Sequence, residues 1–250
     1  MPSDCSFDFK REFLDLTQSL KQCFKTAELF GEEDFALAPP LRYGTASLED
    51  REQKLHALYR KFENCHNCAL SLTRKKIVFG MGSFYPQVLF VGEGPGYEED
   101  KTGLPFVGRA GELLDKILKA IGLDRNKVYI SNIVKCHPID DVDHPEMRGN
   151  DRPPQPSEIE ACRTILDQQI EILEPPVLCA LGETAAKVLL QTEESISRLR
   201  GKVYDFQYPV SKKTVPLLPT YHPAALLRDE LLKKDVWTDM KLLRAILTQI

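Results

Sequence analysis

The sequence contains no apolar run of the roughly 18 residues that a membrane-spanning helix requires. Its first residues, MPSDCSFDFKREF, also lack the basic start and the apolar stretch of a secretory signal. We therefore expect a cytoplasmic protein that makes no membrane contact. Because thiols stay reduced in that compartment, the 7 cysteines are more consistent with free thiols or metal ligands than with disulfides.

The chain also has little excess charge, no internal repeat and no low-complexity tract. A net charge of −4 argues against a general surface for binding polyanions. It does not exclude a local basic groove, because nucleic-acid binding depends on the electrostatic field at the site. With 250 residues, the chain is long enough to bury a full hydrophobic core.

Two helical patterns precede the main part of the chain. Apolar residues recur in steps of three and four over residues 9–30, which predicts an amphipathic helix. The following stretch, GEEDFALAPPLRYGTAS, is rich in proline, glycine and acids and is typical of a linker. Ser47 and Asp50 then form a capping-box start for a second helix. We place a helical extension and linker at residues 1–46 and one domain at 47–250.

Within the second region, short apolar strands alternate with helical patterns. The expected strands are Gln87–Gly92, Lys127–Asn132, Val177–Leu181 and Thr214–Tyr221, and the expected helices are Gly108–Ile121, Pro156–Leu173 and Gly182–Leu190. This alternation predicts an α/β fold with a parallel sheet sandwiched between helices. Ligands of such folds bind beyond the carboxyl ends of the strands. Three distinctive peptides, GEGPGYEED, SNIVKCHP and TYHPAALLR, follow or overlap such ends.

Four of the cysteines form a candidate metal-binding set. Cys65 and Cys68 form a C-x-x-C pair, which alone is also consistent with buried thiols or a redox dithiol. Cys136 follows a strand end, and Cys162 lies in an expected helix. Four thiolates can complete either a tetrahedral zinc site or a [4Fe–4S] cluster. Zinc ribbons usually pair two C-x-x-C units, so one pair and two single cysteines slightly favour a cluster, although the spacing does not decide between them.

A glycine-rich loop, VGEGPGYEEDKTGLPFVGRAGELL, carries the most information. Its three glycines, from Gly92 to Gly96, let the backbone approach a ligand closely. The spacing is G-x-G-x-G and no helix is expected to open at Gly96, which excludes a dinucleotide-binding fingerprint. A P-loop is excluded because no G-K-[ST] follows. The carboxylates of Glu93 and Glu99, with Phe106 after a proline, then indicate either an active site or an acidic surface turn.

The peptides GEGPGYEEDKTGLPFVGRAGELL, VYISNIVKCHP and YHPAALLR, with CHNC ahead of them, resemble the family 4 uracil-DNA glycosylases, which carry an iron–sulfur cluster. The resemblance covers about residues 62 to 250, with the motifs in the family's order. It implies a three-layer α/β/α fold and the hydrolytic removal of uracil from DNA, which leaves an abasic site. It also makes Cys65, Cys68, Cys136 and Cys162 the expected ligands of a structural [4Fe–4S] cluster.

The resemblance further implies roles for three side chains around a base that has been flipped out of the DNA. Phe106 is expected to stack on the uracil ring, and Asn132 to read its edge by accepting from N3–H and donating to O4. His222 is expected to donate a hydrogen bond to uracil O2 as negative charge develops on the leaving base. The alternative for Asn132 is a strand-end cap, and for His222 a structural role.

The glycine loop resembles the water-holding loop of the superfamily. Gly92 and Gly94 are expected to lie against the substrate, and other branches place an aspartate where this chain has Gly94. We therefore give Glu93 a supporting catalytic role, and we expect Glu99 to help shape the pocket against the methyl group of thymine.

Uracil-containing DNA, single- or double-stranded, is the partner that the resemblance implies. Arg74, Arg109 and Arg228 are candidate phosphate contacts, although each could equally be a solvated surface charge. We expect a monomer that associates with DNA. Residues 1–46 lie outside the resemblance, and we consider them a candidate docking segment for a replication or repair protein.

Two features of the chain bear on competing interpretations. The 25 residues between Cys136 and Cys162 exceed what the family leads us to expect, and they predict an enlarged acidic loop near the DNA-binding face. The chief alternative is a non-catalytic or covalent uracil-DNA-binding protein of the same fold, but the sequence contains no K-R-R-I-H-like peptide. A zinc-bound nucleic-acid module without enzymatic activity is a second alternative.

Overall fold

The computed structural model describes residues 48–250. The expected helix over residues 9–30, the linker after it and the Ser47 cap lie outside this range. The second helix is confirmed as α2 (Leu48–Phe62), and it leads to a short 3₁₀ turn, η1 (Ala69–Leu72). None of the helices in residues 48–250 combines the length and the hydropathy needed to span a membrane.

A six-stranded sheet forms the centre of the fold. Its strands are β1 (Met81–Gly82), β2 (Val88–Gly92), β3 (Val128–Asn132), β4 (Leu178–Leu181), β5 (Tyr204–Gln207) and β6 (Thr214–Thr220). The spatial order is β1-β3-β2-β4-β6-β5, in which β3, β2, β4 and β6 run parallel. The two edge strands pair antiparallel to their neighbours. The four parallel strands confirm the sequence-based expectation, whereas β1 is too short and β5 too polar to show an apolar run.

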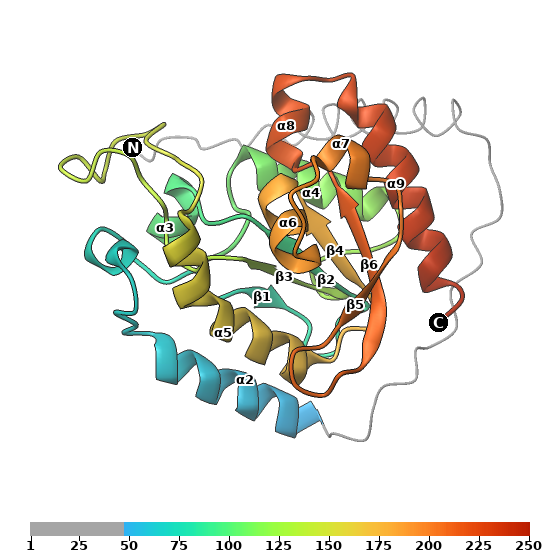
Figure 1. Ribbon diagram of the computed structural model, residues 1–250, viewed down its shortest axis with the longest axis horizontal. Coiled ribbons are helices and arrows are strands. Elements are labelled where there is room, and N and C mark those ends of the chain that lie inside the picture. Colours follow the sequence, from blue (N-terminus) through green and yellow to red (C-terminus); the bar gives the residue numbers. More distant parts are fainter. Residues whose placement is uncertain (1–47) are drawn as a thin grey trace, which may run out of the picture. The chain divides into compact units, whose positions relative to one another are not determined.

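Helices cover both faces of the sheet, which confirms the three-layer sandwich (Figure 1). The helices that follow α2 are α3 (Tyr97–Thr102), α4 (Arg109–Ala120), α5 (Pro156–Leu173), α6 (Glu183–Leu190), α7 (Ile196–Leu199), α8 (Pro223–Arg228) and α9 (Leu232–Leu247). Apolar residues of α2, α5, α6 and α7 form one core layer, and those of α4, α8 and α9 form the other.

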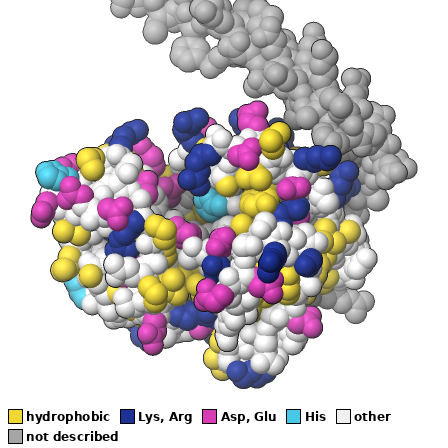
Figure 2. Space-filling view, turned by 45° about the horizontal axis from the view of Figure 1, so that its top comes forward, with side chains coloured by type: hydrophobic (Ala, Val, Ile, Leu, Met, Phe, Trp, Pro, Cys, Tyr) yellow, Lys and Arg dark blue, Asp and Glu magenta, His cyan; other side chains and the backbone are white. Residues whose placement is uncertain are grey.

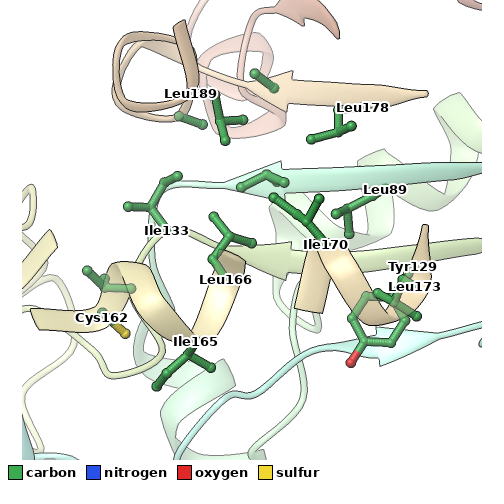
Figure 3. Packing of buried hydrophobic residues seen from close by; sticks show 14 of the residues in the cluster. Leu89, Tyr129, Ile133, Cys162, Ile165, Leu166, Ile170, Leu173, Leu178 and Leu189 are labelled. Atoms are coloured by element: carbon green, nitrogen blue, oxygen red, sulfur yellow. The ribbon is translucent and has the colours of Figure 1, made fainter. Parts of the chain in front are cut away.

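The packing of α5 explains why one long amphipathic helix can organise the cysteine region. Its residues Leu166 and Ile170 lie near Ile133 and Leu89 of the sheet layer (Figure 3). Ile165 of the same helix lines the cysteine pocket. Cys162 lies on the same helix, near its amino end. Burying a leucine or isoleucine side chain contributes about 1.5–3 kcal/mol to stability. The buried face of α5 therefore holds the helix against the sheet, and this fixes the position of Cys162.

The glycine loop differs from the sequence-based expectation in one respect. A helix does open at the third glycine, because Gly96 is the N-cap residue of α3. Glu98, Glu99 and Asp100 stand in its first turn, where negative charge is favoured by the helix dipole. The expectation that no helix begins there was wrong, and the exclusion of a dinucleotide fingerprint therefore rests on the glycine spacing alone.

The long segment between Cys136 and Cys162 has defined structure. An isolated β-bridge joins Ile139 to Asp151 at its base. Inside it, the buried Asn150 accepts from the Asp141 backbone N–H at 2.7 Å and donates to the carbonyl oxygens of Asp141 and His144. The enlarged loop is therefore closed on itself by backbone and side-chain hydrogen bonds.

Candidate active site

Three candidate residues meet at the carboxyl edge of the parallel strands. Gly92 ends β2 and pairs in register with Asn132, the last residue of β3. His222 follows β6 by two residues and is the N-cap residue of α8. Figure 2, in which the top of Figure 1 comes forward, shows a hollow in this face with a histidine side chain inside it. The strand-end peptides that the sequence singled out therefore come together in space.

The side chain of Asn132 lies next to Gly92, where any larger residue would collide with it. A Cβ atom at position 92 would overlap Asn132 Oδ1 and lie 2.8 Å from Cζ of Phe106. Asn132 is 2% exposed, and its Oδ1 atom has no hydrogen-bond partner among residues 48–250. A buried acceptor without a partner costs about 1–3 kcal/mol, so Oδ1 of Asn132 is available to a donor that enters the site.

Phe106 is held in an unusual backbone conformation next to this amide. Its φ angle is 53°, a left-handed value that is rare for an aromatic residue. Glu99 Oε1 accepts from the N–H groups of Val107 and Gly108 at 2.9 and 3.0 Å. Arg125 donates to the carbonyl oxygens of Pro105 and Phe106.

The hydrogen bonds of Glu99 and Arg125 fix the same turn of the backbone, the one that carries Phe106. Together they hold four successive backbone groups around the Phe106 ring, which is buried and lies 5.4 Å, centroid to centroid, from the ring of His222. The Oε1 atom of Glu99 is thus engaged by the turn that carries Phe106. Arg125, which sequence reasoning missed, reaches this turn from the segment after α4.

The surroundings of His222 define its protonation state. Its Nδ1 atom accepts a hydrogen bond from the Ala224 N–H at 3.2 Å. Burial, with a smaller contribution from the positive charge of Arg228, lowers the pKa of His222 to about 4. At neutral pH the imidazole is therefore uncharged, with Nδ1 as the acceptor and Nε2–H available as a donor.

A buried ion pair supports the strand end that precedes His222. Thr220 donates to Asp239 Oδ2 at 2.6 Å, and Arg200 donates to both carboxylate oxygens of Asp239. The guanidinium of Arg200 also lies 5.6 Å from the ring centroid of Tyr221. Asp239 on α9 and Arg200 after α7 thus hold the two residues before His222.

Glu93 is engaged by a partner from a distant segment. Its carboxylate accepts a hydrogen bond from the hydroxyl of Thr184, in the first turn of α6. The next residue, Gly94, lies against the side chains of Val134 and Pro138. The loop is therefore fixed on one side by α6 and on the other by the segment after β3.

The four candidate cysteines line one small pocket. Cys65 and Cys68 precede η1, Cys136 lies in the segment that follows β3, and Cys162 is on α5. Among residues 48–250, no three His, Cys, Asp or Glu side chains are gathered as the ligands of a single metal ion. The pocket nonetheless brings together all four thiols that the sequence selected.

The surroundings of these thiols suit an anionic group. Burial raises the pKa of Cys136 to about 12, and it also raises the pKa of Cys162. Arg74 donates to Cys136 Sγ at 3.5 Å, and the Lys135 N–H donates to Cys162 Sγ at 3.3 Å. A bound metal centre would replace the thiol protons, and the two neighbouring cations would offset the thiolate charge. The donor set therefore fits a four-thiolate centre.

The three candidate phosphate contacts occupy different environments. Arg109 and Arg228 are exposed, at the first residue of α4 and the last residue of α8. Arg74 is partly buried against Cys136. In addition, Arg148 of the enlarged loop pairs with Glu98 at 2.7 Å and lies 5.1 Å from the ring centroid of Tyr97. The enlarged loop thus lies beside α3, directly after the glycine loop.

Comparison with known proteins adds a family to this geometry. The family model described as the uracil DNA glycosylase superfamily matches residues 79–241. A type-4 uracil-DNA glycosylase of Thermotoga maritima is 42% identical over 180 residues, which are 72% of this chain and 86% of that protein. Those of Pyrobaculum aerophilum and Archaeoglobus fulgidus are 41% and 37% identical, over 75% and 76% of this chain and 90% and 91% of their own lengths.

These matches cover most of the chain and nearly all of each relative. The chain therefore belongs to the uracil-DNA glycosylase superfamily and, within it, to the type-4 uracil-DNA glycosylases.

Proposed function

We propose that this protein is a monofunctional glycosylase of DNA repair, which flips uracil out of DNA and hydrolyses its N-glycosidic bond. The observation that carries the proposal is the buried, unpartnered Oδ1 atom of Asn132, next to Phe106 and His222. Membership of the type-4 family supports the same activity.

Recognition of the base follows from the amide of Asn132. Its Oδ1 atom accepts from uracil N3–H, and its amide N–H donates to O4, whereas cytosine presents the reverse pattern of donor and acceptor. Stacking of the flipped base on Phe106 contributes about 1–3 kcal/mol. Gly92 and Gly94 let the backbone lie close to the base. Glu99 contributes to excluding thymine by holding the turn that carries Phe106.

Cleavage of the glycosidic bond leaves negative charge on the departing uracil. His222 donates from Nε2–H to O2, and it does so as a neutral imidazole because its pKa is far below 7. Removing one such preorganised donor typically slows a reaction by about 10²- to 10³-fold. Glu93, oriented by Thr184, supports the water that attacks the sugar carbon.

We further propose that Cys65, Cys68, Cys136 and Cys162 hold a [4Fe–4S] cluster. When bound, the cluster supplies a structural cross-link between the segment before η1, the end of β3 and α5. Arg74 provides positive charge near Cys136, and the Lys135 ammonium provides it near Cys162. Measuring iron and acid-labile sulfide per chain in anaerobically purified protein tests this assignment, and stoichiometric zinc without iron would contradict it.

Binding of DNA calls for contacts to phosphates on either side of the flipped nucleotide. We propose Arg74, Arg109 and Arg228 for these contacts, with single- or double-stranded uracil-containing DNA as the substrate. That the protein acts as a cytoplasmic monomer on DNA, and that residues 1–46 dock a replication or repair protein, are proposals from sequence alone.

An oligonucleotide with a single uracil tests the function directly. The iron-loaded protein is incubated with the labelled strand, which is then treated with hot alkali and separated on a denaturing gel beside a thymine-containing control. Breakage that depends on both uracil and alkali is the expected result. A denaturant-resistant shifted band would instead identify a covalent uracil-DNA binder, and an unchanged strand would contradict the enzymatic assignment.

A further inference from the structure

A buried lysine, Lys135, contacts the backbone of Asn132, the proposed base-reading residue. The Lys135 side chain is 0% exposed, and its ammonium donates to Ser131 Oγ at 2.6 Å and to the carbonyl oxygen of Asn132 at 2.7 Å. Within residues 48–250, no carboxylate lies within ion-pair distance of this ammonium. A buried charge is costly unless an opposite charge is near, so the nearest source of negative charge matters.

The cysteine pocket is that source. Lys135 lines the same pocket as the four cysteines, precedes Cys136 in the chain, and donates its backbone N–H to Cys162 Sγ. Four thiolates around an iron–sulfur or zinc centre leave a net negative charge, which stabilises an adjacent buried ammonium. Lys135 therefore lies between the proposed metal centre and the strand end that carries Asn132.

The same network anchors the helix that supplies Cys162. Ser131 Oγ is 2.9 Å from Gln169 Oε1, and Gln169 donates to the Phe79 carbonyl oxygen at 2.8 Å. Gln169 and Cys162 are both on α5, and Ser131 and Gln169 are fully buried. A buried polar network holds its members in one arrangement only when every member is hydrogen-bonded. Removing the Lys135 ammonium should therefore loosen the carboxyl end of β3.

We propose that Lys135 is a positioning residue that ties the four-cysteine centre to Asn132 and so keeps the base-reading amide in place. The proposal rests on the proposed function, because it concerns how uracil is read at that site. In this view the four-cysteine centre does more than cross-link three segments, because it also orders the carboxyl end of β3. Recognition of uracil should depend on Lys135, whereas general affinity for DNA should not.

The test uses the anaerobically purified, full-length protein carrying Lys135→Met. Lys127→Met is the matched control, because Lys127 stands at the other end of β3, is exposed, and also donates its ammonium to a backbone carbonyl. Four readouts are compared with wild type: iron per chain, amide hydrogen exchange of the peptide covering residues 128–136, kcat/KM on a single-uracil oligonucleotide, and Kd for uracil-free DNA.

We expect Lys135→Met to speed exchange in this peptide and to lower kcat/KM by about tenfold or more, while Kd for uracil-free DNA stays within about twofold. Lys127→Met should match wild type in all readouts. Unchanged exchange and kcat/KM in an iron-loaded Lys135→Met protein would overturn the proposal.

If Lys135→Met fails to retain iron, Ser131→Ala decides the question, since it removes one acceptor of the ammonium and leaves the charge. Faster exchange at the end of β3 with full iron content is then expected, and unchanged exchange would overturn the proposal. Exchange is measured without turnover, so a wild-type protein that releases no uracil would refute the proposed function while leaving the Lys135 result interpretable.

Discussion

Replacing Asn132 with alanine should lower the activity without lowering the stability. In the uracil complex, the substitution leaves N3–H and O4 of the base buried without partners. Each such group costs about 1–3 kcal/mol, so the two together reduce kcat/KM by about 30-fold to about 10⁴-fold. In the free protein, the same change removes the buried Oδ1 acceptor that has no partner. The melting temperature should therefore stay constant or rise.

Asn150 provides a matched control, because it is also a buried asparagine but is fully hydrogen-bonded by the enlarged loop. Asn150→Ala should leave uracil recognition intact and cost about 1–3 kcal/mol. For a domain of this size, each kcal/mol corresponds to about 2–4 °C in melting temperature. Thermal melts at one scan rate and steady-state kinetics on the single-uracil strand measure both effects. An Asn132→Ala protein that melts several degrees lower yet keeps its kcat/KM would refute the reasoning.

Substitutions at three further positions test other parts of the site. Arg228→Gln removes a charge that lowers the pKa of His222, so this pKa should rise above about 4 in an NMR titration. Because the neutral imidazole is the proposed active form, the acid limb of kcat should move to higher pH with this pKa; an unmoved limb would contradict the proposed role. Thr184→Val should reduce kcat by about tenfold with KM unchanged, and Thr184→Ser should restore it, since Glu93 regains its donor. Gly92→Ala should abolish uracil excision while the protein still folds, and full activity would show that the hollow is not the base pocket.

The sequence predicted the parallel core well, because strands buried on both faces appear as continuous apolar runs. The strands β2, β3, β4 and β6 and the helix α5 lie within a residue or two of their expected bounds. The edge strands β1 and β5 could not be found in this way. Half-exposed edge strands carry polar residues, and a two-residue strand has no measurable period.

The candidate site was predictable to the extent that its residues stand at strand ends. Asn132 ends an apolar strand and His222 follows one, both in distinctive peptides, and Phe106 lies next to both of them. The residues that support the site were not predictable, because Thr184, Arg125 and Asp239 reach Glu93, Pro105 and Thr220 from segments that show no local signal. Such contacts arise from tertiary packing, which a single sequence does not display.

The amount of free uracil released per molecule of protein shows whether this protein turns over uracil in DNA. Iron-loaded protein is incubated with an excess of a single-uracil oligonucleotide, and the free base is quantified by chromatography with mass detection. Many uracil molecules per protein chain are expected, and no free base from a matched thymine strand. Release of one equivalent or less, or a protein that retains the strand under denaturing conditions, would contradict it.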